Sequence, residues 1–169
     1  MTKEQFILSE IWNLTLAGAF QRANIYQKGI KEKQKVDFKN KLHELVLDIA
    51  KQYKIEVIDK NHLNNIYLIS QLIHNALQNG NLNFGISQKV LNLYLKYLWC
   101  LERIPTPPHF PVDRIIQKEL RIKKIVSWTQ MKNEKDYMRI IEHAKLKAQE
   151  QNISPSQLEL NLYSRRNNK

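Results

Sequence analysis

Residues 87–101 read SQKVLNLYLKYLWCL and form the most apolar helical pattern in the chain. A helix that is apolar on most of its surface is typically enclosed by other helices. We therefore predict a central, buried helix over about Ser87 to Leu101. Lys89 and Lys96 are notable within it, because lysine is rarely buried in proteins.

Helical spacing continues through most of the remaining chain, with apolar residues recurring every three or four positions. The further predicted helices cover about residues 3–28, 37–53, 60–77, a short segment after Asp113, 134–151 and 155–163. The segment 54–59 is rich in β-branched residues but is too short to form the basis of a β-sheet. The prediction is an all-α fold, a single compact helical domain of six or seven helices.

Residues 102–112 read ERIPTPPHFPV and interrupt the helical pattern. Four prolines in this stretch fix the backbone φ angle and remove hydrogen-bond donors, so the segment cannot be helical. We expect a shaped, extended loop. Asp113 follows directly, and we expect its side chain to cap the N-terminus of the short helix predicted over RIIQKEL.

The composition limits the class of protein. The chain has 169 residues and a formal net charge of +11, of which +3 lies in residues 1–84 and +8 in residues 85–169. A positive field of this kind attracts polyanions, and nucleic acid is the commonest partner. One cysteine excludes a disulfide framework, and no segment suits a membrane span or a signal peptide. We expect one domain over residues 1–163, a basic disordered tail over 164–169, and a cytoplasmic location.

Residues 84–116 hold the pattern that points to chemistry. Gly85 precedes the apolar helix, Lys89 lies on its first turn, and Pro111-Val112-Asp113 closes the proline-rich loop. This order resembles the helix-hairpin-helix DNA glycosylase superfamily, the group that includes endonuclease III and the 8-oxoguanine glycosylases. Positions of the family's hairpin and of its Pro-Val-Asp are matched here by Gly85, Ile86, Gln88, Lys89, Asn92 and residues 111–113.

The resemblance implies a DNA glycosylase that removes a damaged base from duplex DNA, and it leaves open whether the protein also has AP lyase activity. Lys89 would attack the sugar C1′, and Asp113 would accept a proton and stabilise the cationic sugar. Two sets of residues would contact the phosphates of the nucleic acid. The first, at the hairpin, is Gly85, Ile86, Ser87 and Gln88; the second, a basic cluster after Asp113, is Lys118, Arg121, Lys123 and Lys124.

The substrate base would have to leave the duplex and enter a pocket with stacking side chains. Candidates for that pocket are Trp12, Phe20, Tyr94, Trp99, Phe110 and Trp128, and nothing in the sequence selects among them. We expect no metal site, because the five histidines lack ligand spacing, and no small-molecule cofactor, because no nucleotide-binding glycine motif is present.

Each candidate residue also has a simpler interpretation. Gly85 can end a turn, Lys89 can rest its stem on the core, and Asp113 can serve as a helix cap alone. Two alternative functions therefore stay open. One is a non-enzymatic helix-hairpin-helix DNA-binding module; the other is a helical protein-interaction or defence accessory protein that binds an acidic partner.

Overall fold

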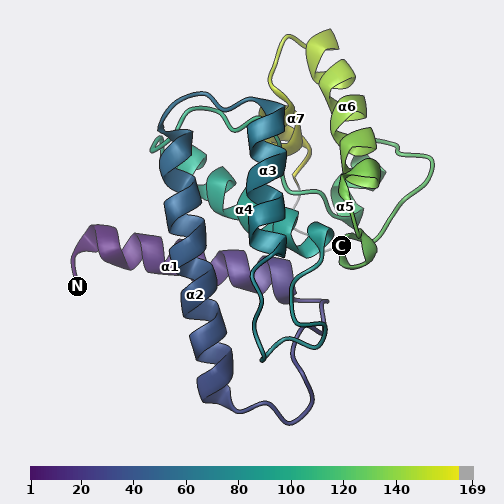
Figure 1. Ribbon diagram of the computed structural model, residues 1–169. Coiled ribbons are helices and arrows are strands. Elements are labelled where there is room, and N and C mark those ends of the chain that lie inside the picture. The colour runs from purple at the N-terminus through teal and green to yellow at the C-terminus, as the bar shows by residue number, and fades with distance from the viewer. Residues whose placement is uncertain (164–169) are drawn as a thin grey trace, which may run out of the picture.

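The computed structural model describes residues 1–163, and these residues form an all-helical fold, as the sequence predicts. Seven α-helices and two short 3₁₀ helices follow one another along the chain (Figure 1). They are α1 (Lys3–Phe20), α2 (Glu32–Ala50), η1 (Lys51–Lys54), α3 (Asp59–Ser70), α4 (Phe84–Cys100), α5 (Arg114–Glu119), η2 (Trp128–Gln130), α6 (Glu134–Glu150) and α7 (Pro155–Leu162). The predicted number of six or seven helices is confirmed.

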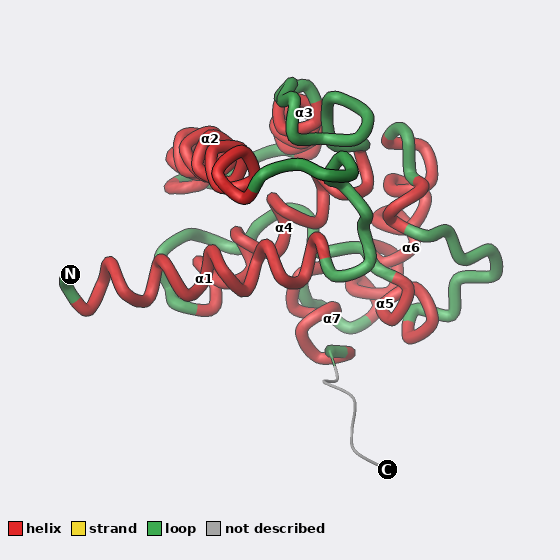
Figure 2. Tube along the Cα trace, turned by 90° about the horizontal axis from the view of Figure 1, so that it is seen from below, coloured by secondary structure: helices red, strands yellow, loops and turns green. Residues whose placement is uncertain are grey.

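Helix α4 is the centre of the fold. Figure 2 shows it between α1 and the α2–α3 pair, and it contacts α1, α3 and η2. Between Phe84 and Lys96, every residue except Leu93 is buried. The predicted central buried helix is thus confirmed. It starts three residues earlier than predicted because the Asn83 side chain accepts a hydrogen bond from the Ile86 N–H (2.9 Å) and caps it.

Polar side chains cap three of the helix starts, among them the predicted cap at Asp113. Thr2 and Ser154 each accept a hydrogen bond from a backbone N–H in the first turn that follows. Oδ1 of Asp113 accepts from the N–H groups of Ile115 (2.8 Å) and Ile116 (3.0 Å) at the start of α5. Such caps satisfy backbone donors that have no partner within the helix.

Two helices end earlier than their apolar pattern predicts. Helix α1 stops at Phe20 rather than near residue 28, and α3 stops at Ser70 rather than near residue 77. Beyond both ends the chain pairs with itself: Gln27 N donates to Ala76 O (3.0 Å), and Gln78 N donates to Ile25 O (2.8 Å). This pairing between distant segments replaces helical hydrogen bonds, which local periodicity cannot foresee.

The predicted helix-hairpin-helix element is not confirmed. Residues 71–83 join α3 to α4 through several turns, and Gly85 lies within the first turn of α4. A Cβ atom on Gly85 would lie 1.8 Å from the backbone oxygen of Trp128. Glycine is therefore required here so that η2 can pack directly on α4, and not for a turn.

None of the helices in residues 1–163 is long and apolar enough to cross a bilayer. The tail at residues 164–169, which the sequence predicts to be disordered, lies outside the described part of the chain.

Candidate functional site

Lys89 and Asp113 come together although 24 positions separate them in the sequence. Nζ of Lys89 lies 3.5 Å from Oδ2 of Asp113, and it also lies over the Trp128 ring, 3.8 Å from its centroid. Lys89 projects from the first turns of α4, Asp113 begins α5, and Trp128 begins η2. Three segments thus meet around one amine.

The Lys89 amine is held in a poorly solvated place. The residue is 7% exposed, while the Asp113 side chain retains 28% of its accessible surface. Burial lowers the pKa of Lys89 below its ordinary value; the Asp113 carboxylate opposes this shift, and the Arg22 charge adds to it. A larger fraction of neutral amine is available at Lys89 than at an exposed lysine, and the neutral amine is the nucleophilic form.

Two pockets are relevant to the pair: Asp113 lines one of them, and the other is lined by residues adjacent in sequence to Trp128 and one helical turn before Lys89. The first, of about 210 Å³, is lined mainly by polar residues from three segments. Its lining is Arg22, Ala23, Asn24, Ile25, Asn79, Asn81, Leu82, Asn83, Ile86 and Thr129. We call it the amide pocket. Ile86 is three residues before Lys89, on the same helix face, and Thr129 follows Trp128 in the sequence. Arg22, which also lines the pocket, lies close enough to Lys89 to influence its pKa.

The second pocket is smaller, about 50 Å³, and Asp113 lines it together with Leu93, Lys96 and Glu159. Lys96, which the sequence singles out, donates to both carboxylate oxygens of Glu159 on α7, at 2.9 and 2.7 Å. Both residues are buried, at 8% and 5% exposure. Periodicity places Lys96 on a buried helix, but nothing in the sequence identifies Glu159 as its partner.

The structure does not support a phosphate contact through the backbone of Gly85, Ile86, Ser87 and Gln88. These four residues are buried, and three of their N–H groups donate within the chain: Gly85 to Met131 O, Ile86 to Asn83 Oδ1 and Ser87 to Asn83 O. The side-chain amide of Gln88 donates a hydrogen bond to the Val112 carbonyl. A phosphate site needs free donors, and these donors are already used: the Gly85 N–H by Met131, and the N–H groups of Ile86 and Ser87 by the capping residue Asn83.

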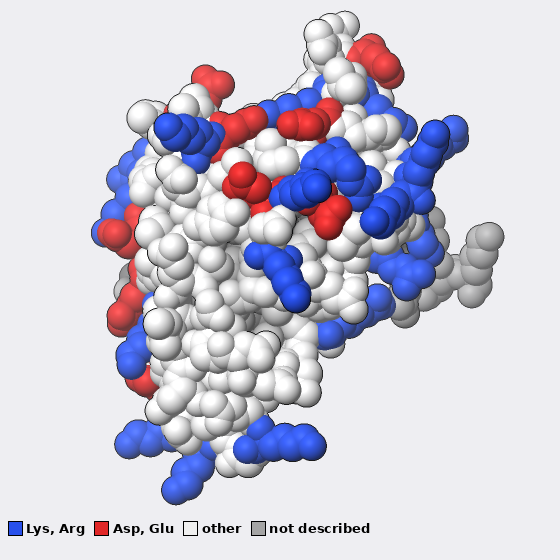
Figure 3. Space-filling view, turned by 45° about the vertical axis from the view of Figure 1, so that its right-hand side comes forward, with Lys and Arg blue, Asp and Glu red and all other residues white. Residues whose placement is uncertain are grey.

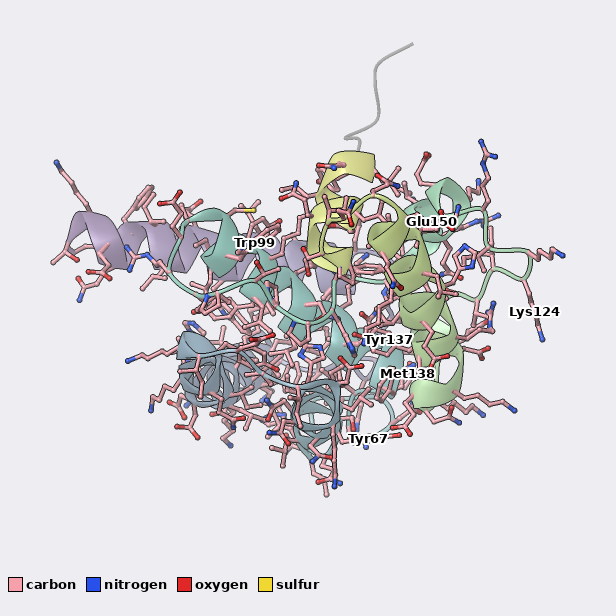
Figure 4. All side chains as sticks on the ribbon, turned by 90° about the horizontal axis from the view of Figure 1, so that it is seen from above. Tyr67, Trp99, Lys124, Tyr137, Met138 and Glu150 are labelled. Carbon is pink, nitrogen blue, oxygen red and sulfur yellow. The ribbon has the colours of Figure 1, made fainter. Side chains whose placement is uncertain are left out.

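The basic cluster is exposed, as a phosphate-facing surface requires. Lys118, Arg121, Lys123 and Lys124 all have solvent-exposed side chains on α5 and the loop that follows it. Figure 4 shows Lys124 at the tip of this loop, directed away from the body of the protein. Figure 3 shows Lys and Arg along the right-hand side of one face and a second group at its lower end. The positive charge is therefore concentrated in more than one place.

A buried cluster of histidine and tyrosine side chains forms where His109, in the loop 102–112, packs against His62 of α3 and Tyr137 of α6. The rings of His62 and His109 are 4.5 Å apart at their centroids, and each residue is at most 1% exposed. Nδ1 of His62 pairs with the Tyr53 hydroxyl (2.7 Å), and Nδ1 of His109 pairs with the Tyr137 hydroxyl (2.9 Å). Nε2 of His109 lies 3.2 Å from Oδ1 of Asp59. Asp59 also pairs with Lys145 from α6.

Acid pH is expected to destabilise the protein through this cluster. Burial is the main cause that lowers the pKa of both His62 and His109 in the fold, below an unfolded value of about 6.5. Below about pH 6.5 the unfolded chain therefore binds more protons than the folded protein. The free energy of unfolding keeps the full contribution of these two histidines above about pH 6.5 and falls below it, by up to about 1.4 kcal/mol per pH unit for each histidine. Urea unfolding across this range measures the slope.

The matched control for that slope is the double variant His62→Gln, His109→Gln. It removes both titrating rings and is expected to flatten the pH dependence of the free energy of unfolding between about pH 6.5 and pH 5. An unchanged slope in the double variant would show that other groups carry the acid sensitivity.

Residues 1–163 contain no group of three or more His, Cys, Asp or Glu side chains arranged to hold a metal ion. Comparison with protein-family models, with curated proteins and with solved structures found no match to this chain.

Proposed function

We propose that this protein binds DNA and removes a damaged base from it, as a DNA glycosylase. The observation that carries the proposal is the desolvated Lys89 amine, 3.5 Å from the Asp113 carboxylate and stacked on Trp128. A nucleophilic amine beside a proton acceptor is the arrangement that covalent catalysis at a sugar carbon requires.

The proposed reaction assigns one role to each side chain. The neutral amine of Lys89 attacks C1′ of the damaged nucleotide while the bond from C1′ to the base breaks, and the base leaves with that electron pair. Asp113 stabilises the positive charge that develops on the sugar and accepts the proton that the Lys89 nitrogen loses. The product is an amine-linked sugar that opens to a Schiff base, in which Lys89 Nζ is bonded to C1′.

The amide pocket supports the proposal with a place for the base. A base must leave the stack before its C1′ can be reached. The volume of about 210 Å³ lies below the roughly 300–1,000 Å³ of pockets for drug-sized ligands, which suits a single base. Its lining offers amide donors and acceptors and the Arg22 guanidinium, and no carboxylate. No aromatic side chain is among the residues that line the pocket, and Trp128 precedes Thr129, which does line it.

The exposed basic side chains would hold the nucleic acid backbone. Lys118, Arg121, Lys123 and Lys124 extend from α5 and the next loop, on the segment that begins at Asp113. Contacts of this kind release counterions, so binding weakens as salt rises, and each phosphate contact adds to the slope. The backbone of Gly85–Ser87 is not part of this interface, because its donors are used within the chain.

Trapping with borohydride tests the chemistry. The protein is incubated with duplexes that carry single base lesions, and borohydride reduces any Schiff base to a stable adduct. Wild type is expected to give base release and an adduct. Lys89→Met should give no adduct, and Asp113→Asn should lower base release by about 10²–10⁴-fold. Asparagine caps helices as well as aspartate does, so Asp113→Asn preserves α5.

Lys132→Met is the matched control, because Lys132 is an exposed lysine distant in sequence from the pair. It should retain the adduct. Absence of base release on every lesion tested would contradict the enzymatic proposal, whereas base release without an adduct would remove only the covalent role of Lys89.

A second candidate is a non-enzymatic DNA-binding protein. It is favoured by the burial of Lys89 against Trp128, which also suits a purely structural lysine, and by the pocket of about 50 Å³ at Asp113, which is too small for a base. This candidate predicts salt-sensitive DNA binding with no base release. Absence of salt-sensitive DNA binding would instead favour a helical protein that binds an acidic partner.

A further inference from the structure

Two buried glutamine side chains bind backbone in the same way, and both adjoin the candidate site. Nε2 of Gln88 donates to the Val112 carbonyl (2.8 Å), and the Val112 N–H donates back to Gln88 Oε1 (3.1 Å). Nε2 of Gln117 donates to the Val126 carbonyl (2.8 Å), and the Val126 N–H donates back to Gln117 Oε1 (2.9 Å). Both glutamines are 0% exposed. We call each of these pairs a clasp.

The clasps join the three segments that meet at the Lys89 amine. Gln88 immediately precedes Lys89, and Val112 immediately precedes Asp113, so the first clasp connects the two backbones one residue from the ion pair. The second clasp connects α5, which Asp113 begins, to the segment two residues before Trp128. Nε2 of Gln117 also donates to the Asp113 carbonyl (3.0 Å).

We propose that Gln88 and Gln117 are positioning residues, which set the distances from Lys89 to Asp113 and to Trp128. The proposal rests on the proposed function only in calling this constellation a catalytic site; the geometry itself is tested on the free protein. A two-point hydrogen bond fixes both the separation and the register of the two backbones, which a single hydrogen bond or apolar contact does not.

The first clasp is itself held in one orientation. Oε1 of Gln88 also accepts from Nδ2 of Asn92 (3.1 Å), and that amide donates to the Tyr137 hydroxyl (3.0 Å). Two N–H groups therefore point at Oε1, which orients the amide so that its nitrogen meets the Val112 carbonyl. Figure 4 shows Tyr137 on the inner side of α6, where it closes this network.

Asp113 depends on this support because its carboxylate has two separate partners. Oδ1 caps α5 at the N–H groups of Ile115 and Ile116, while Oδ2 faces Lys89. The cap holds Asp113 to α5, but it does not hold α5 to α4. The Gln88 clasp is the hydrogen-bonded link between α4 and the residue before Asp113, across 24 positions of sequence.

NMR of the free protein tests the positioning role through the electrostatic coupling between Lys89 and Asp113. The Lys89 pKa is measured with and without Asp113→Asn, first in wild type and then in the Gln88→Met background. The change in pKa caused by Asp113→Asn should be clear in wild type and fall to less than about half in Gln88→Met, since coupling requires contact. Asn65→Leu, a buried polar change near Tyr53, is the matched control and should keep the full coupling.

The second clasp has its own readout. The end of the Lys89 side chain lies over the Trp128 ring, so ring currents shift its CH₂ protons upfield. Gln117→Met should remove most of that upfield shift, while Asn65→Leu should retain it. Gln88→Met should retain more of it than Gln117→Met, because the first clasp does not bind the Trp128 segment.

Two results would overturn the proposal: full Lys89–Asp113 coupling in a folded Gln88→Met protein, or an unchanged ring-current shift in Gln117→Met. If Gln88→Met does not fold, Gln88→Glu decides, because it keeps the oxygen that accepts from Val112 and Asn92 and replaces the donor to the Val112 carbonyl by an oxygen that repels it. Loss of folding in both Gln88 variants would assign Gln88 to general stability and also overturn a local positioning role. None of these measurements uses DNA, so they are independent of base release.

Discussion

Replacing Lys96 by methionine is expected to lower the free energy of unfolding by about 3–5 kcal/mol, because it leaves a buried carboxylate without its partner. Lys96 Nζ lies 2.9 and 2.7 Å from the two oxygens of Glu159, and both residues are at least nine-tenths buried. Methionine fills a volume similar to that of lysine, so the loss of stability measures the cost of the unpaired Glu159 charge and not the cost of a cavity. Urea denaturation of the variant and wild type measures the difference.

The pH dependence of Lys96→Met gives an internal check. Burial already raises the pKa of Glu159, and the Lys96 charge opposes that shift. Without Lys96 the pKa should rise further, so the variant takes up a proton at Glu159 as the pH falls and recovers part of its stability. The double variant Lys96→Met, Glu159→Leu should recover most of the loss at neutral pH. Equal destabilisation in the single and double variants would contradict this account.

Replacing Gly85 by alanine is expected to have the second largest effect, a loss of about 3 kcal/mol, near the upper end for overpacked cores. The added Cβ would lie 1.8 Å from the Trp128 oxygen and 2.8 Å from the Trp128 carbonyl carbon. Backbone atoms cannot rotate away, so η2 must shift and carry Trp128 off Lys89. Thermal or urea unfolding measures the loss, and the NMR shift of the Lys89 CH₂ protons reports the displacement.

Gly18→Ala is the matched control for Gly85→Ala. Both glycines lie within helices, but a Cβ on Gly18 would meet the Cδ1 atom of Leu93 at 2.8 Å, the far end of a flexible side chain. That side chain can rotate, and alanine favours the helix by about 1 kcal/mol over glycine. Gly18→Ala should therefore change stability by less than about 1 kcal/mol. Similar losses in the two variants would show that contact with backbone is not the cause.

Local signals in the sequence predicted the helices well where the chain interacts mainly with itself nearby. The apolar run 87–101, the prolines of 102–112 and the Asp113 cap all act within a few residues, and the structure contains each feature. The helix ends at Phe20 and Ser70 were missed, because segments about fifty residues apart pair there and compete with helical hydrogen bonds.

The sequence likewise predicted only part of the candidate site. Lys89 and Asp113 were paired through the family resemblance, and their local positions, one on a buried helix and one at a helix start, are as the sequence predicts. The predicted hairpin is not confirmed, and the N–H groups of Gly85, Ile86 and Ser87, which were expected to contact a phosphate, are used by Met131 and Asn83. A glycine before an apolar helix has the same local pattern whether it makes a turn or admits a neighbouring backbone.

By itself the sequence determined the helical class, the excess of positive charge in its second half, and the placement of Lys89 and Lys96 on an enclosed helix. Periodicity, proline chemistry and charge are properties of single segments, so a single segment suffices to find them. Only the tertiary structure decided that Lys89 meets Asp113 and Trp128, that Lys96 meets Glu159, and that two glutamine clasps hold the site. Each of these contacts depends on how distant segments are brought together, because the path of the intervening chain sets which side chains meet.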